Sequence, residues 1–459
     1  MYKIDFDTPI HVHFIGIGGI SMSGLAQVLL SRGFTVSGSD NSKSALTDEL
    51  MNAGATIYIG QRASNISEDI DLVVYTAAIH EDNPEYARCV ELSLPMMSRA
   101  CLLGQMMKNY NNAIAISGTH GKTTTSSMAS EILMAADLDP TLSIGGILKS
   151  IGGNIRVGHS DIFLTEACEY TNSFLNFFPK IGIILNVEED HLDFFKDIHE
   201  IRKSFHKFAK LIPGDGILFI NHAIEGREII TKDLDCPVKT FGFTSDCDYY
   251  ASDLTLDDKG SYHFTFHTPE AKSQEIVLQV VGKHNVCNAL AALAMADYLD
   301  IPLEIAARGI HAFTGTVRRF EFKGSIGGVN IIDDYAHHPT EIEATLEAAK
   351  NYPHGRLWCV FQPHTYTRTK AFMDDFAKAL SKAENVILAD IYAARETDTL
   401  GISSKDLQKA INNLGGKCFY FPSFDEIENF LLENCIPDDL LITMGAGDVV
   451  KIGEKLLGN

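Results

Sequence analysis

The sequence has no excess of basic residues, no paired cysteine motif and no long apolar run. Lysine and arginine total 38 against 60 aspartates and glutamates, which gives a formal net charge of −22. A nucleic-acid-binding protein normally carries a basic surface, so this balance argues against that class. Anionic small molecules stay open as ligands, because backbone N–H groups can bind phosphates on an acidic protein.

The nine cysteines are scattered along the chain, odd in number, and never form a C-x-x-C pair. This spacing argues against a disulfide framework or a zinc cage, and favours a reducing compartment. No stretch approaches 18 uninterrupted apolar residues, and the first residues lack the apolar core of a signal peptide. We therefore expect a soluble cytoplasmic protein without membrane insertion.

The length of 459 residues suits about three domains of roughly 150 residues each. Short apolar strands alternate with helical segments throughout, and glycine-rich turns follow two of the strands, which is typical of parallel sheets. We predict an α/β fold of three domains: Rossmann-like over 1–107, P-loop ATPase-like over 108–314, and Rossmann-like over 315–459.

Residues 117–125 read SGTHGKTTT, between an apolar strand and a helical segment. A strand-to-helix turn leaves N–H groups unpaired at the positive end of the helix dipole, so it forms a phosphate site. Gly118 and Gly121 let the backbone wrap closely, Lys122 can neutralise phosphate oxygens, and the Thr123 hydroxyl can bind Mg²⁺. The turn predicts ATP binding; the alternative is a glycine turn with a surface lysine.

Two further polar residues follow apolar strands of the same block. Glu166 comes at the end of DIFLTE, and His191 follows KIGIILNVEED. Because ligands of open α/β sheets bind at the carboxyl ends of the strands, Thr123, Glu166 and His191 are predicted to face a shared pair of metal ions. Either residue alone would more simply be a surface polar group.

Near the N-terminus, GIGGISMSG (16–24) resembles a dinucleotide-binding turn. Gly16 and Gly18 fit the G-x-G part, but Ser21 stands at the third glycine position. Asp40 ends a later strand, about where a ribose-binding carboxylate is expected. The turn predicts the diphosphate of some nucleotide, leaves NAD open, and has a tight turn without ligand as its alternative.

Taken together, the chain resembles the Mur ligase family over essentially all its residues. The resemblance rests on nine collinear motifs: GIGGISMSG, SGTHGKTTT, EACEY, NVEEDHLD, GKHNVCNALAA, GTVRRFEFKG, DDYAHHPTE, FQPHTYTRT and MGAGD. The short phosphate loop GTxGKT is a feature of this family. It explains why Ile116 stands where other phosphate loops carry a leading glycine.

The resemblance implies an ATP-dependent ligase of peptidoglycan synthesis. Its expected substrates are UDP-N-acetylmuramate and L-alanine, joined through an acyl phosphate of the lactyl carboxylate and a tetrahedral intermediate. ATP and Mg²⁺, with two ions, are the expected cofactors, and the oligomeric state stays open. The alternatives are a ligase that recycles whole peptides onto the same sugar nucleotide, a nucleotide-binding regulator and, most weakly, an NAD-dependent dehydrogenase.

The family pattern, carried over residue by residue, implies the following sites. The catalytic residues are Lys122, Glu166, His191 and Arg319, and the metal ligands are Thr123, Glu166 and His191. ATP contacts are Gly118, Thr119, His120, Gly121, Lys122, Thr123, Thr124, Asn285, Asn288, Arg319 and Asp334. The UDP part of the substrate contacts Gly16, Gly18, Gly19, Ser21 and Asp40. The wall around the lactyl and alanine groups consists of Tyr335, His337, His338, His364 and Arg368.

Simpler interpretations stay open for some of these residues. The alternative for the segment DDYAHHP is a polar loop alone, for His364 a structural histidine, and for Asn288 a partial role in helix packing. Some relatives carry an arginine where this chain has Thr365, so that contact cannot be carried over. Lys203 and Lys207 lie where several family members use a carbamylated lysine, and the sequence assigns neither that role.

Overall fold

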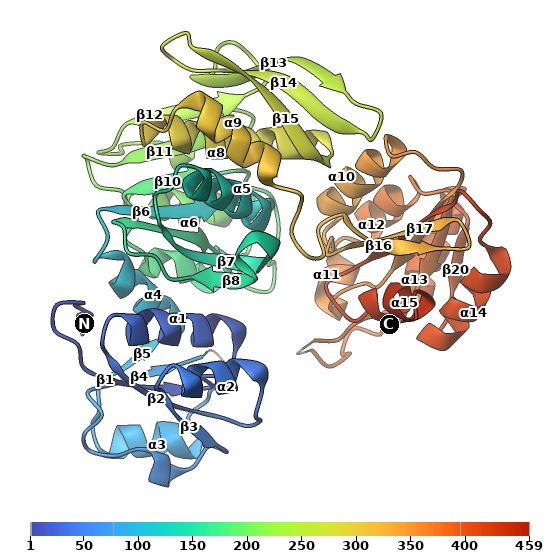
Figure 1. Ribbon diagram of the computed structural model, residues 1–459. Helices are drawn as coiled ribbons and strands as arrows, with labels where there is room; N and C mark the ends of the chain where they lie inside the picture. The colour runs from blue at the N-terminus through green and yellow to red at the C-terminus, as the bar shows by residue number, and fades with distance from the viewer. Residues whose placement is uncertain (1, 77, 395, 459) are drawn as a thin grey trace. The chain divides into compact units, whose positions relative to one another are not determined.

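The computed structural model (Figure 1) describes residues 2–76, 78–394 and 396–458. The chain divides into two compact units. Unit 1 comprises Met1–Gly118, Leu133–Val187 and Arg202–Lys239, and unit 2 comprises Thr119–Ile132, Glu188–Ile201 and Thr240–Asn459. No helix in the described part of the chain combines the length and apolar character that crossing a membrane requires.

Unit 1 begins with a parallel five-stranded sheet in the order β3-β2-β1-β4-β5. Its strands are β1 (His11–Ile15), β2 (Thr35–Asp40), β3 (Thr56–Ile59), β4 (Leu72–Tyr75) and β5 (Met96–Ser98). Its helices are α1 (Ile20–Ser31), α2 (Ala45–Asn52), α3 (Pro84–Glu91) and α4 (Arg99–Met107). Figure 1 shows α1 and α2 on one side of this sheet and α3 on the other, as in a doubly wound fold.

Six strands of a second, ten-stranded sheet lie in unit 1, in the order β11-β10-β6-β9-β7-β8. Its central strands run parallel, and β7 and β8 form an antiparallel pair. The strands are β6 (Asn112–Ser117), β7 (Thr141–Leu148), β8 (Gly153–Arg156), β9 (Ile162–Ala167), β10 (Ile181–Ile184) and β11 (Ile217–Asn221). Helix α7 (Arg227–Ile230) and most of α6 (Ile198–Ala209) belong to unit 1, and most of α5 (Lys122–Ala135) belongs to unit 2.

In unit 2 a β-rich stretch precedes two helices that pack closely. It contains β12 (Val238–Gly242), β13 (Tyr249–Leu256), β14 (Ser261–His267) and β15 (Ser273–Val281), followed by α8 (Lys283–Tyr298) and α9 (Leu303–Ala312). Gly309 of α9 lies so near α5 that an added Cβ would come within 2.5 Å of the Ile132 Cα. The helix that follows the phosphate loop is thereby packed against α9.

The C-terminal part of unit 2 is a six-stranded sheet in the order β16-β17-β21-β18-β19-β20, parallel except for the edge strand β16. The strands are β16 (Glu321–Ile326), β17 (Val329–Asp334), β18 (Leu357–Phe361), β19 (Asn385–Leu388), β20 (Cys418–Tyr420) and β21 (Leu440–Met444). The helices are α10 (Pro339–Lys350), α11 (Tyr366–Ala371), α12 (Met373–Leu380), α13 (Ser404–Asn413), α14 (Phe424–Asn434) and α15 (Val450–Leu456).

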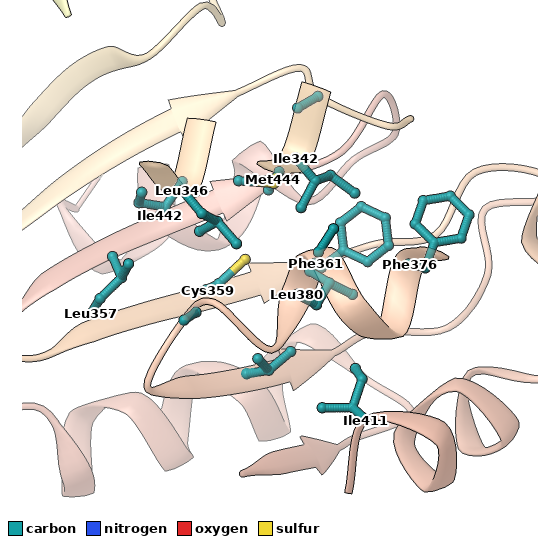
Figure 2. Close-up of a cluster of buried hydrophobic side chains, with 14 of the residues drawn as sticks. Ile342, Leu346, Leu357, Cys359, Phe361, Phe376, Leu380, Ile411, Ile442 and Met444 are labelled. Atoms are coloured by element: carbon teal, nitrogen blue, oxygen red, sulfur yellow. The ribbon is translucent and has the colours of Figure 1, made fainter. Parts of the chain in front are cut away.

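Strand β18 shows how the sequence determines this sheet. All five of its residues are buried, as expected for a parallel strand covered on both faces. Leu357, Cys359 and Phe361 pack in one apolar cluster with α10, α12 and α13 (Figure 2). Trp358 and Val360, the alternate residues, pack in a second cluster with α14 and α15.

The α/β class predicted from the sequence is confirmed. Strands expected within VHFIGIG, FTVSGSD, DIFLTE, RLWCVFQ and DLLITMG are β1, β2, β9, β18 and β21. Strands β3, β5, β7, β8, β11, β16 and β20 were missed. Most of these are short or lie at sheet edges, where the apolar pattern is weak.

Candidate active site

The glycine-rich turn after β1 is closed by a carboxylate. The N–H of Gly18 donates to Asp40 Oδ2 at 2.9 Å, and a Cβ added at Gly18 would lie 2.9 Å from the same oxygen. Gly16 has φ of +86°, which favours glycine. As predicted, Asp40 ends β2, and it reaches this turn from the neighbouring strand.

A cavity of about 480 Å³ opens beside this turn, lined in part by Gly16, Gly19 and Asp40. Gln61 and Asn83 line the same cavity and were not predicted. The Asn83 Nδ2 group donates to Gln61 Oε1 at 2.6 Å, and Asn83 also caps α3. In the sequence, each of these residues only follows a strand, Gln61 after β3 and Asn83 after β4. Many polar residues follow strands, so this position alone could not identify them.

Ser21 has a different neighbour in unit 1. Its hydroxyl accepts a hydrogen bond of 2.9 Å from Arg99 Nη1, at the start of α4. Arg99 was not predicted, because no motif surrounds it. The contact brings a partly buried cation to the N-terminal end of α1, next to the turn expected to hold a diphosphate.

The second glycine turn connects β6 to α5, as predicted. Gly118 has φ of +146° and Gly121 φ of +82°, backbone conformations that favour glycine. Within unit 2, Lys122 Nζ donates to the carbonyl of Thr119 at 3.1 Å. The loop therefore folds back on its own lysine, and α5 begins at that residue. Binding of phosphate oxygens by the first N–H groups of α5 stays a prediction.

Glu166 lies in unit 1 on β9, which runs parallel to β6 with Glu166 paired to Ile116. Its Oε1 accepts the N–H of Gly145 at 2.6 Å. A Cβ added at Gly145 would come within 2.5 Å of the carboxylate, so this side chain occupies space that only glycine provides. Glu166 thus stands one strand away from the end of β6, as predicted.

In unit 2, His191 lies in the loop that follows β10, with φ of +53°. Its neighbour Asp190 was not predicted. Asp190 Oδ1 accepts from Arg368 Nη2 at 3.0 Å and from Nε at 3.3 Å. Burial opposes the ionisation of Asp190, but the Arg368 guanidinium and His191 outweigh it, and its pKa lies below the usual range. The loop that carries His191 is thereby bound to Arg368, which belongs to the predicted wall around the lactyl and alanine groups, here called the acceptor wall.

The wall residues contact one another. The Tyr335 and His337 rings lie 5.5 Å apart, and the His337 and His364 rings 5.7 Å apart. Arg368 Nη1 lies 3.2 Å from His364 Nδ1. Thr365, directly before α11, has φ of +65° and ψ of 147°, a region almost restricted to glycine. Strained backbone therefore separates His364 from Arg368.

The two arginines of the RRFE motif have different surroundings. Arg318 donates to buried Asp333 at 2.8 Å and to the carbonyls of Gly445 and Gly447. Arg319 places its guanidinium 5.3 Å from the centre of the Tyr335 ring. The Arg318 guanidinium lies 5.0 Å from the centre of the same ring, so both arginines lie beside Tyr335. The predicted contact of Arg319 with ATP stays a prediction.

Asp334, predicted to contact ATP, is buried and accepts the N–H groups of Phe320 and Ala336 at 2.8 and 2.7 Å. Burial raises the pKa of Asp334 to about 6, against the opposing charge of Arg319. Asn285 and Asn288 share a face of α8, as predicted, and Asn288 Nδ2 donates to Asn285 Oδ1 at 3.0 Å. Contacts of all three with ATP stay predictions.

Four ionisable residues meet beside the phosphate loop. His120 Nδ1 lies 3.2 Å from Glu341 Oε1, and Nε2 lies 3.4 Å from Glu188 Oε2. Burial opposes the charge of His120, but the two carboxylates raise its pKa to about 9. The ring of His338 lies 4.8 Å from that of His120. Neither Glu188 nor Glu341 was predicted, although both lie within quoted motifs.

His120, Glu188 and His338 bring their ligand atoms within 4.8 Å of one another, close enough to hold a metal ion. Both nitrogens of His338 already have partners, however. Nε2 lies 3.0 Å from the Glu189 carbonyl, and Nδ1 accepts the N–H of Thr340 at the start of α10. The cluster is better described as an ion-pair network that connects the phosphate loop, the loop before His191 and α10.

Three family models match this chain in succession: the Mur ligase family, catalytic domain, over residues 11–111, the Mur ligase middle domain over 116–296, and the Mur ligase, glutamate ligase domain over 318–447. The chain belongs to the Mur ligase family. This assignment confirms the α/β fold of three domains, while the exact boundaries at 107 and 314 stay predictions.

Among relatives in this family, UDP-N-acetylmuramate–L-alanine ligase from Lachnospira eligens is 59% identical over 458 residues, and that from Agathobacter rectalis 58% over 457, each covering 100% of both chains. Among solved structures, UDP-N-acetylmuramate–alanine ligase from Thermotoga maritima is 28% identical with a TM-score of 0.79, and the murein peptide ligase from Psychrobacter arcticus 26% identical with a TM-score of 0.70. Both cover 98% of each chain.

The residues that a Mur ligase would use for Mg²⁺ suit that ion. Thr123 and Glu166 supply hydroxyl and carboxylate oxygens, the hard ligands that Mg²⁺ prefers. The Glu166 carboxylate is already oriented by the N–H of Gly145. The three predicted ligands are Thr123 and His191 in unit 2 and Glu166 in unit 1, so their joint site stays a prediction. Lys203 and Lys207 both have exposed side chains on α6.

Proposed function

We propose that this chain is an ATP-dependent ligase that joins L-alanine to the lactyl carboxylate of UDP-N-acetylmuramate. Relatives named for that reaction match the chain over its full length at 59% and 58% identity. The geometric observation that carries the proposal lies in unit 2. There, the loop of Glu188 and Asp190 connects the phosphate loop, through Thr119, to the acceptor wall, through Arg368.

The proposed reaction has two steps. A lactyl carboxylate oxygen attacks the γ-phosphorus of ATP, the bond from phosphorus to the ADP oxygen breaks, and an acyl phosphate forms. The neutral amine of L-alanine then attacks the acyl carbon to give a tetrahedral intermediate. When this intermediate collapses, the carbon–oxygen bond to phosphate breaks and the nitrogen loses a proton.

Each group of residues has a part in these steps. Lys122 and Arg319 stabilise the charge that grows on the transferred phosphoryl group. Arg368 binds the carboxylate of alanine, and the cavity beside Asp40 holds the UDP part. Mg²⁺, when bound by Thr123, Glu166 and His191, neutralises phosphate charge. Two ions and a cytoplasmic location belong to this proposal.

The second candidate, recycling of whole peptides, has support from the murein peptide ligase fold, but at 26% identity. The two activities differ in the second substrate. Purified protein with ATP, Mg²⁺ and UDP-N-acetylmuramate should release phosphate when L-alanine is added, and more slowly with other amino acids. Faster release with a peptide than with alanine would favour recycling, and equal release without the sugar nucleotide would exclude both.

An isotope experiment tests the carboxylate step. Oxygen-18 placed in the lactyl carboxylate should appear in the released phosphate, because the oxygen that attacks phosphorus leaves with it. Phosphate free of the label, with product formed, would rule out the acyl phosphate.

A further inference from the structure

Glu341 contacts residues from three predicted parts of the site. Its Oε1 lies 3.2 Å from Nδ1 of His120 in the phosphate loop and 3.9 Å from Nη1 of Arg319. Its Oε2 accepts the N–H of His337 at 3.1 Å and lies 3.4 Å from the Nδ1 of that histidine. One carboxylate therefore contacts the phosphate loop, the arginine expected at the phosphoryl group, and the acceptor wall.

The position of Glu341 in the fold makes these contacts specific. It lies in the first turn of α10, after the His338 cap and Pro339. A glutamate there would ordinarily support the helix dipole and stay in solvent. Instead, only 14% of its side chain is exposed. Burial opposes its charge, but His337, His120 and Arg319 outweigh burial, and the pKa of Glu341 lies well below the usual range.

We infer that Glu341 is a positioning residue of the ligase reaction. It fixes the position of His120, and with it the phosphate loop, relative to Arg319 and His337. The transferred phosphoryl group and the acceptor carboxylate are thereby kept in the orientation that the reaction needs. This inference rests on the proposed function. Misplacement of reacting groups by about 1 Å can cost about 10²-fold in rate without removing any group that touches substrate.

The test compares Glu341→Gln with Glu343→Gln. Glu343 lies on the same helix, but it is about half exposed and pairs with Lys382. We expect Glu341→Gln to lower kcat at least about tenfold and to leave KM for UDP-N-acetylmuramate within about twofold of wild type, because the UDP part of that substrate is proposed to bind beside Asp40 in unit 1. Glu343→Gln should match wild type within about twofold. A kcat for Glu341→Gln within about threefold of wild type would overturn the inference.

A double-mutant cycle with His120→Asn tests whether the two side chains act together. If Glu341 acts through His120, the double variant should be little slower than the slower single variant. Multiplied losses would contradict a joint role. Thermal unfolding of each variant checks that folded protein is compared. If Glu341→Gln unfolds below the assay temperature, Glu341→Asp replaces it, because aspartate withdraws the carboxylate by one methylene. The same limits on kcat and KM then apply to Glu341→Asp.

A measurement without turnover separates this inference from the proposed function. Within the described residues, the titratable groups recorded beside His120 are Glu188 from the loop after β10, Glu341 in α10, and His338, which caps α10. Histidine-ring NMR, with the His120 signal assigned from His120→Asn, should show the ring losing its proton at lower pH in Glu341→Gln than in wild type. An unchanged titration would overturn the inference, whereas wild-type protein that never releases phosphate would contradict only the proposed function.

Discussion

The two glycine-rich turns differ in the charged residues that contact them. In unit 1, the turn after β1 is closed by one carboxylate, Asp40, and its cavity is lined by segments around the same sheet, with Gln61, His80, Asp82 and Asn83 among the lining residues. In unit 2, the loop after β6 lies among ion pairs that His120, Glu188 and Glu341 form across distant segments. The first arrangement suits binding of a group that does not change. The second places charge where charge must move during a reaction.

The sharpest way to separate the two regions is to remove the phosphate-loop cation. Lys122→Ala should reduce kcat by about 10³-fold or more, since charge developing on the phosphoryl group loses its partner. KM for UDP-N-acetylmuramate should change little, because its cavity belongs to the other turn. Steady-state phosphate release measures both constants. A variant with near-normal turnover would remove Lys122 from the chemistry.

The paired arginines offer a second comparison, within unit 2. Arg319→Ala should lose at least about 10²-fold in turnover, with ATP binding within about tenfold of wild type. Arg318→Ala should be much milder in turnover, but it leaves buried Asp333 without its cation and should cost about 3 kcal/mol of stability. Kinetics and urea unfolding of both variants distinguish them. The opposite pattern would place the phosphoryl arginine at 318.

On the binding side, Asp40→Ala should raise KM for UDP-N-acetylmuramate about tenfold, as expected for loss of a charged hydrogen bond. KM for ATP should stay near the wild-type value. Calorimetry with UDP alone should show the same weakening. Tight binding of NAD by the wild type would overturn the assignment of this turn.

The smallest expected effect concerns the strained backbone at Thr365. Thr365→Gly should raise the free energy of unfolding by about 1 kcal/mol, because relief of strain exceeds the entropy that glycine adds to the unfolded chain. Turnover should fall about twofold as His364 and Arg368 become less fixed. Thr365→Ala, which keeps the strain, serves as the control and should match wild type. Greater stability in the alanine variant would show that the hydroxyl, and not the backbone, is responsible.

The features that could be predicted from the sequence are those that depend on neighbouring residues in the chain. Both glycine turns, the end of β2 at Asp40 and the start of α5 at Lys122 follow from short patterns of glycine and apolar residues. Glu341 could not be found in this way, because a glutamate in the first turn of a helix usually stabilises that helix alone. Asp190 and Glu188 likewise look like solvent-facing loop residues. Only tertiary packing gives these carboxylates cationic partners.

Thr365 also bears on how the protein can change. Selection of variants for thermal stability alone would favour glycine at this position, because glycine removes the backbone strain of Thr365. Selection for cell growth would oppose the same exchange whenever cell-wall supply limits growth. Selection for stability and selection for turnover would therefore act in opposite directions on Thr365, although its side chain has no assigned role in the reaction.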